Sequence, residues 1–170
     1  MFPARFRGET GRRQAGFNVI ELVVVILIVA ALAVIALPAM NKLINAQRAK
    51  SSAFDLLADL TYARSEAIAR GTDVIMSSTS GGVLWNDGWT IRETTGGTVL
   101  RVGEARPSGI EFKGTATALT FERTGRVTTA GGGTVAFGIT PKDSDVQEYQ
   151  KRCVRLDPSG RARSVTGACT

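Results

Sequence analysis

The sequence predicts an α+β protein, in which a long N-terminal helix packs on an antiparallel, β-rich globular head. Three observations lead to this fold class. Residues 22–37 form an unbroken run of 16 apolar residues, and an apolar pattern of helical period then continues to Arg70. From Thr72 onward, short β-type runs alternate with turns rich in Gly, Pro and Asp. At 170 residues, the chain is long enough to build one such core.

Composition narrows the chemistry that the chain can perform. The sequence contains no His, which excludes Ser-His-Asp and Cys-His catalysis and removes the commonest transition-metal ligand. Its 2 Cys cannot build a zinc site by themselves. An enzyme would have to work with carboxylates, Lys, Ser or Tyr. Composition alone therefore does not exclude an enzyme.

The N-terminal apolar segment allows three interpretations. From Phe17 it reaches 37 with only Asn18 and Glu21 as interruptions, long enough to cross the roughly 30 Å hydrocarbon layer. A cleaved secretory signal peptide is one interpretation, although its small-residue motif, 31–33, lies inside the run. A signal anchor is the second, but it leaves Glu21 unexplained, because a carboxylate at that depth costs about 2.5 kcal/mol or more.

The third interpretation comes from a resemblance. The stretch Gly16-Phe17-Asn18-Val19-Ile20-Glu21-Leu22 resembles the prepilin signature of type IV pilins and type II secretion pseudopilins. The resemblance implies a leader over 1–16, cleavage after Gly16 by prepilin peptidase, and methylation of Phe17. It further implies an inner-membrane, single-pass protein whose residues 17–37 form the transmembrane and filament-core helix, with the head in the periplasm. Glu21 would pair with the new amine of a neighbouring subunit during assembly.

The second part of the helix is predicted over 38–71. Pro38 removes a helical hydrogen bond, so a kink is expected there. Residues 41–70 then read as an amphipathic helix that ends at Gly71. Its apolar positions recur with a period of 3.6 residues at Ala53, Leu56, Leu57, Leu60, Ala63, Ala67 and Ile68.

The head is predicted over 72–170 as two small antiparallel sheets packed on this helix. The expected strands are 74–76, 89–92, 99–102, 110–112, 119–121, 135–139, 152–156 and 163–166. Three other motifs receive structural interpretations: the Gly131-Gly132-Gly133 run is a loop rather than a phosphate cradle, the pair Asp143 and Asp145 lies in a solvated loop, and Trp85 and Trp89 are packing residues.

Head motifs narrow the resemblance to the GspH/FimT group of minor pilins and pseudopilins, with a pilin-like fold. The motifs that carry it are Ala63-Arg64-Ser65-Glu66-Ala67, Asn86-Asp87-Gly88-Trp89, Phe121 with Gly125-Arg126, and Gly160-Arg161-Ala162-Arg163 before Cys169. The resemblance implies a minor subunit near the filament tip, with other major and minor pilins or pseudopilins as partners. The expectation that this protein is not an enzyme and holds no metal or cofactor comes from this resemblance. Some type IV pilus members of the group bind DNA during transformation through a C-terminal Gly-Arg-x-Arg element.

Charge patterning independently marks the same C-terminal segment. Residues 151–170 carry Asp157 as their only acid, against five cations: Lys151, Arg152, Arg155, Arg161 and Arg163. Asp157-Pro158-Ser159-Gly160 fits a type I turn with Gly160 in its fourth place, so a basic hairpin is expected. Arg161 and Arg163 would share a strand face, which only one of Arg152 and Arg155 can join.

The basic hairpin allows several functions. The five cations are candidate contacts to double-stranded DNA, an acidic polymer drawn to positive charge. They could instead form a solvated strand edge, or dock acidic residues of another subunit. Hence a type II secretion minor pseudopilin of the H type is an alternative function, and a membrane-tethered periplasmic binding domain is another.

In an oxidising compartment, Cys153 and Cys169 are expected to form one disulfide.

Overall fold

A side chain caps the start of the long N-terminal helix. The computed structural model describes residues 18–94, 97–143 and 145–169; the leader, Gly16 and Phe17 lie outside these residues. Helix α1 spans Val19–Arg70. The backbone N–H of Ile20 donates a hydrogen bond to Oδ1 of Asn18 at 3.3 Å, so Asn18 serves as the N-cap. Glu21 occupies the first helical turn, where a carboxylate favourably meets the positive end of the helix dipole.

The chain divides into two compact units, with the boundary between Ala39 and Met40. In the first unit, the large apolar side chains that the structure describes between 19 and 37 are exposed in the isolated chain. Among the described residues, no single helix is long and apolar enough for a membrane span, whereas Val19–Val34 and Ala39–Arg70 taken together pass on length and composition. The transmembrane assignment of 17–37 and the kink at Pro38 both stay predictions.

The second unit contains the remainder of α1 and all the strands. A buried stripe of α1 faces its core through Ala49, Ala53, Leu56, Leu60, Ala63 and Ala67, which follows the predicted spacing. Ile68, expected on this stripe, is instead 52% exposed. Four of the six buried positions are alanines, so the strands can approach the helix backbone closely.

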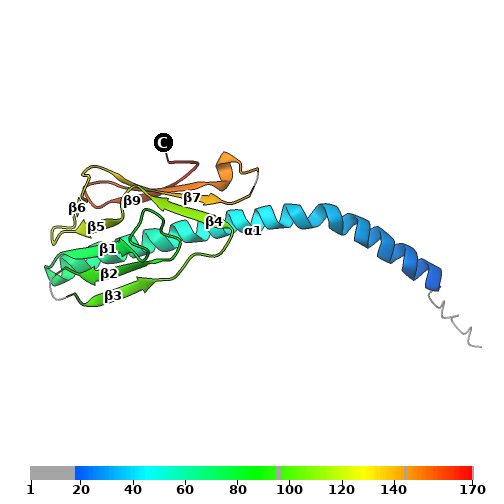
Figure 1. Ribbon diagram of the computed structural model, residues 1–170, viewed down its shortest axis with the longest axis horizontal. Helices are drawn as coiled ribbons and strands as arrows, with labels where there is room; N and C mark the ends of the chain where they lie inside the picture. Colours follow the sequence, from blue (N-terminus) through cyan, green and yellow to red (C-terminus); the bar gives the residue numbers. More distant parts are fainter. Residues whose placement is uncertain (1–17, 95–96, 144, 170) are drawn as a thin grey trace, which may run out of the picture. The chain divides into compact units, whose positions relative to one another are not determined.

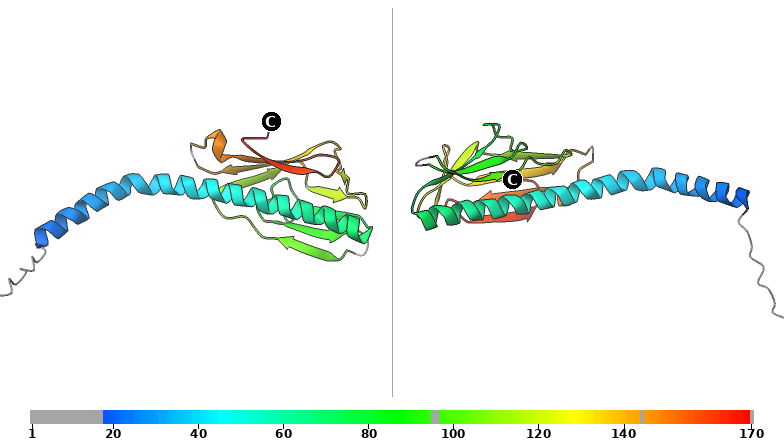
Figure 2. Two further views of the ribbon diagram at one scale, coloured as in Figure 1. Left: turned by 180° about the vertical axis from the view of Figure 1, so that it is seen from behind. Right: turned by 90° about the horizontal axis from the view of Figure 1, so that it is seen from below.

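Two antiparallel sheets cover this part of the helix, as predicted (Figures 1 and 2). The five-stranded sheet has the order β3-β2-β1-β5-β6 and comprises β1 (Val74–Ser78), β2 (Trp89–Glu93), β3 (Val99–Gly103), β5 (Ala118–Phe121) and β6 (Val127–Thr128). The four-stranded sheet has the order β4-β7-β8-β9 and comprises β4 (Ile110–Gly114), β7 (Val135–Pro141), β8 (Arg152–Leu156) and β9 (Ala162–Thr166). A 3₁₀ helix, η1 (Glu148–Gln150), precedes β8.

Aromatic rings join the two sheets in the core. Trp85 and Trp89 are both 0% exposed, which confirms that they are packing residues. The ring of Trp89 from β2 meets Phe112 of β4 edge-on, with centroids 5.7 Å apart. Trp85 meets Phe137 of β7 in the same way at 5.0 Å. The Trp89–Phe112 contact joins strands of different sheets, and the Trp85–Phe137 contact ties the β1–β2 connection to the four-stranded sheet, so both contacts hold the head together.

Candidate nucleic-acid interface

The C-terminal hairpin forms as the sequence predicts. Strands β8 and β9 pair antiparallel, from Arg152 opposite Thr166 to Leu156 opposite Ala162. The turn is closed by a hydrogen bond from the Gly160 N–H to the Asp157 carbonyl at 2.8 Å. The ladder continues one step further, because the Asp157 N–H donates to the Arg161 carbonyl at 3.0 Å.

Strand register decides which arginines share a face. Arg155 lies directly opposite Arg163, so both side chains leave the sheet on one side. Val154 and Leu156 are buried, so their side of the sheet faces the core. Arg155 lies between them in the strand and therefore points to the other, outer side. Arg161 precedes Arg163 by two residues and therefore belongs to the outer side as well. We call Arg155, Arg161 and Arg163 the arginine face.

Two members of the arginine face are exposed, and one of these, Arg163, has an acidic neighbour. Arg161 is exposed, and the Arg163 side chain is 63% exposed. Nη2 of Arg163 lies 2.8 Å from Oδ2 of Asp157. This pair is open to solvent, so it holds the guanidinium in place at a small energetic gain. A phosphate oxygen can compete with Asp157 for the same donors.

The other two predicted cations are placed elsewhere. Lys151 forms an ion pair with Glu148 of η1, and its side chain is only 23% exposed. Arg152 lies on the core side of the sheet, opposite to Arg155, and its Nη1 donates to the carbonyl oxygens of Tyr149 at 2.9 Å and Lys151 at 3.0 Å. The structure thus brings three of the five candidate cations onto one face.

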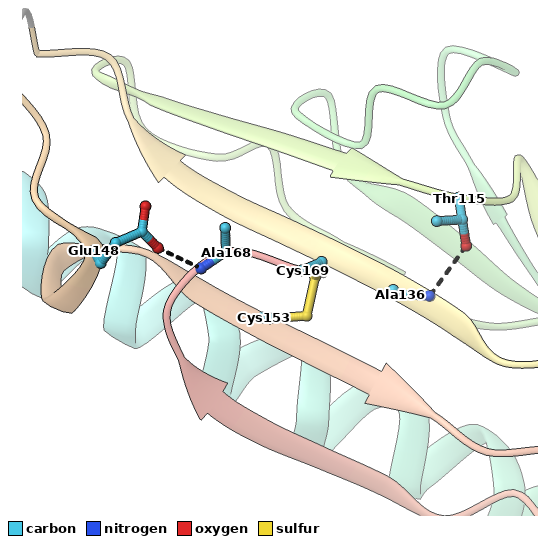
Figure 3. Close-up of a disulfide and its surroundings, with 6 residues drawn as sticks. All are labelled: Thr115, Ala136, Glu148, Cys153, Ala168 and Cys169. Atoms are coloured by element: carbon cyan, nitrogen blue, oxygen red, sulfur yellow. Dashed lines mark hydrogen bonds between the residues drawn. A yellow bond between two sulfur atoms is a disulfide. The ribbon is translucent and has the colours of Figure 1, made fainter.

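A disulfide ties the C-terminal tail to the hairpin (Figure 3). Cys153 and Cys169 are bonded, with their Cα atoms 5.2 Å apart, which confirms the predicted bridge. Cys153 and Arg155 lie on the same side of β8, so the tail returns over the outer face. In register with Cys153 stands Gly138 of β7.

Glu148 holds the tail at a second point. Its Oε2 accepts a hydrogen bond from the Ala168 N–H at 3.0 Å (Figure 3), and its other carboxylate oxygen pairs with Lys151. The hydrogen bond from Lys151, assisted by that from the Ala168 backbone, lowers the pKa of the Glu148 carboxyl. The carboxylate is thereby favoured in its charged form.

Two glycine-containing turns meet beside the arginine face. Gly160 is buried, and a Cβ atom at this position would overlap the carbonyl oxygen of Gly125. The Val127 N–H donates to the Pro158 carbonyl at 2.9 Å, which links β6 to the hairpin turn. Nε of Arg64, on α1, donates to the Gly125 carbonyl at 3.1 Å. Sequence reasoning quoted Arg64, Gly125 and Gly160 as separate motif residues, and only the structure joins them.

Of the remaining loop residues singled out in the sequence, the two aspartates contact α1 and the glycine run does not pack. Asp143 accepts a hydrogen bond from Nδ2 of Asn45 at 3.0 Å, and Asp145 lies 3.5 Å from Nζ of Lys42. In the Gly131-Gly132-Gly133 loop, added Cβ atoms would meet no other atom within 4 Å, which is consistent with an open loop.

Comparison with known proteins places this fold in a family. A family model described as type II transport protein GspH matches residues 52–160, and the chain belongs to this family. It is a type IV pilin-like protein of the GspH/FimT group, in which subunits are minor pilins or pseudopilins. No curated protein sequence gives a significant match.

Solved structures share the fold. A crystal structure of the Pseudomonas aeruginosa type IV minor pilin FimU is similar with a TM-score of 0.56 and 22% identity, covering 68% of this chain and 91% of that one. The minor pseudopilin EpsH from the type 2 secretion system of Vibrio cholerae is similar with a TM-score of 0.55 and 19% identity, covering 70% and 97% respectively. Both confirm the predicted α+β, pilin-like architecture.

Proposed function

We propose that this chain is a minor pilin that prepilin peptidase processes after Gly16 and that a type IV pilus incorporates near its tip. Residues 17–37 hold it in the inner membrane beforehand, with the head in the periplasm. The family supports the assembly with other pilins. The exposed apolar side chains between 19 and 37 support it too, since such a surface has to be covered by lipid or by neighbouring helices.

Glu21 is proposed as the residue that sets subunit register. Cleavage leaves an ammonium group on Phe17 at the start of an apolar helix. Inside a filament, where the dielectric constant is low, an unpaired Glu21 carboxylate is costly and a carboxylate paired with a neighbour's amine is favoured. Glu21 lies in the first turn of α1, close in sequence to that amine.

The assembly proposal is tested with Glu21→Gln, which keeps the shape of the side chain and removes its charge. We expect normal cleavage and loss from sheared filaments, measured by immunoblot. Glu111→Gln, which removes an exposed charge from the head, serves as the control and should be incorporated normally. Equal incorporation of both variants contradicts the role of Glu21. A mature protein that still begins at Met1, by mass spectrometry, contradicts processing and favours a plain membrane-tethered binding domain.

We further propose that the arginine face binds the backbone of double-stranded DNA. This proposal rests on one observation: Arg155 and Arg163 lie opposite each other in the hairpin, and Arg161 lies on the same outer face. Guanidinium groups match phosphate oxygens in geometry and charge. Contacts of this kind position a duplex without reading its sequence, so binding is expected to be weakly sequence-dependent and to fall steeply with salt.

The DNA proposal is tested with the full chain in detergent and a fluorescent duplex of random sequence. Arg161→Ala combined with Arg163→Ala is expected to weaken binding at least tenfold at low salt, measured by anisotropy. Arg92 is exposed on β2 of the other sheet, and Arg92→Ala should leave affinity nearly unchanged. An unchanged affinity of the double variant rules out this interface.

A type II secretion pseudopilin is the second candidate function. The similarity to EpsH, with a TM-score of 0.55 and 19% identity, is nearly as close as that to FimU, with 0.56 and 22%, and it supports this candidate. The same arginines would then dock acidic residues of a neighbouring subunit. This function is indicated if the wild type fails to bind DNA while the double arginine variant loses co-purification with other pseudopilins.

A further inference from the structure

Two turns that contact each other, one between β5 and β6 and one between β8 and β9, have the same local structure. The β5–β6 turn contains Gly125-Arg126, and the β8–β9 turn contains Gly160-Arg161. Both glycines are buried, and their φ angles, +77° and +76°, are almost the same. Each glycine is followed by an exposed arginine. A buried, left-handed glycine therefore presents an arginine to solvent twice, from two different sheets.

Contacts on both sides of Arg126 fix it beside the hairpin turn. Gly125, before it, meets Gly160 through its carbonyl oxygen. Val127, after it, donates its N–H to the Pro158 carbonyl at 2.9 Å. The backbone of Arg126 is thus held between two contacts with the 157–160 turn. Figures 1 and 2 show β6 and this turn at the same end of the head.

The charges of the paired turns are unbalanced. Residues 122–126 and 157–163 carry Glu122 and Asp157 against four arginines: Arg123, Arg126, Arg161 and Arg163. Asp157 is engaged by Arg163. Within the described residues, no hydrogen bond or ion pair occupies the guanidinium groups of Arg126 and Arg161. Two exposed cations that start from adjoining backbones attract an anion with more than one charged group.

We propose that Arg126 is a phosphate contact and that the nucleic-acid interface extends from the arginine face onto the β5–β6 turn. This inference rests on the DNA-binding function proposed above. A polymer with regularly repeated phosphates can contact both turns at once. Arg64 acts as a positioning residue, because its bond to the Gly125 carbonyl holds the β5–β6 turn in place.

The test compares Arg126→Ala with Arg92→Ala in full-length protein, using the random-sequence duplex over a series of salt concentrations. Each phosphate contact that is lost lowers the slope of log affinity against log salt by about 0.9. We expect Arg126→Ala to lower the slope by about that amount and to weaken binding several-fold at low salt. Arg126→Lys, which keeps the charge, should retain the slope, and Arg92→Ala should match the wild type.

The outcomes separate this inference from the function on which it rests. If Arg126→Ala matches Arg92→Ala while the double variant of Arg161 and Arg163 loses binding, the interface is confined to the hairpin and the inference is wrong. If none of these variants changes the affinity, the proposed DNA binding itself is wrong. A slope equally lowered in Arg126→Lys would show that the residue acts through structure rather than charge, and would also overturn the inference.

Discussion

The indole nitrogen of Trp89 donates a hydrogen bond to Oδ2 of Asp59 at 2.8 Å, inside the head. The other carboxylate oxygen of Asp59 accepts from Nη1 of Arg101 at 2.7 Å. One carboxylate on α1 is therefore shared between β2 and β3. Asp59 is only 9% exposed, and a carboxylate so far from water is stable only where hydrogen bonds and an opposite charge compensate it.

Replacing Asp59 is expected to destabilise the head. Asp59→Ala leaves the Trp89 N–H buried without an acceptor, which costs about 1–3 kcal/mol of the free energy of unfolding. Asp59→Asn keeps an acceptor oxygen and should cost less. Urea denaturation followed by Trp fluorescence measures both. Asp145→Ala, which breaks a solvent-exposed pair, is the control and should cost under about 1 kcal/mol; an equal loss in all three variants contradicts the prediction.

A side chain at Gly160 should disturb the contact between the two turns. Gly160→Ala combines a φ of +76° with an overlap on the Gly125 carbonyl, so we expect a loss of about 3 kcal/mol in thermal or urea unfolding. Gly133 has a φ of +79° and open space around it. Gly133→Ala therefore isolates the backbone strain and should cost about 1 kcal/mol. If both variants cost the same, the close approach of Gly160 to Gly125 is not important for stability.

Removal of the disulfide is expected to weaken the head and release the tail. The bridge closes a loop of sequence separation 16, which corresponds to about 3 kcal/mol of stability in the chain-entropy description. Cys153→Ser combined with Cys169→Ser should lower the urea midpoint to match that of the reduced wild type. A double variant as stable as the oxidised protein would show that the Glu148 contact alone secures the tail.

Glu148 makes the attachment of the tail dependent on pH. Its pKa is lowered from the ordinary value of 4.5 by Lys151 and by the Ala168 amide, so the folded state binds this proton more weakly than the unfolded state. The stabilisation is complete above the unfolded pKa and is lost as the pH falls through the folded pKa. We expect wild type to exceed Glu148→Gln in stability near neutral pH, and the difference to vanish in acid. A difference that does not change with pH contradicts this assignment.

Local patterns in the sequence were sufficient to predict most of the secondary structure. The 3.6-residue period marks the buried stripe of α1 from Ala53 to Ala67, because one helix face meets the core. The Asp157-Pro158-Ser159-Gly160 turn and the flanking strands predict the hairpin, since turn chemistry acts within four residues. Strand β6 was missed because two residues, Val127–Thr128, are too few to display a period.

The composition of the interface could not be obtained in this way. The sequence predicts that Arg161 and Arg163 share a strand face and leaves open whether Arg152 or Arg155 joins them. The structure places Arg155 opposite Arg163, turns Arg152 to the core side with Val154 and Leu156 and pairs Lys151 with Glu148. Likewise, Arg64, Gly125 and Gly160 lie far apart along the chain. Their contact depends on how the two sheets pack on α1, which no local pattern encodes.

By itself, the sequence determined the class of the protein, its long helix, all of its strands but β6 and its single cysteine pair, because periodicity, turn residues and composition are properties of neighbouring residues. Tertiary structure alone decided that Arg155, rather than Arg152, joins Arg161 and Arg163, and that Gly125 and Gly160 touch. Which side of β8 faces the core, and the contact between turns of the two sheets, both depend on the apolar burial that brings the sheets and the helix together.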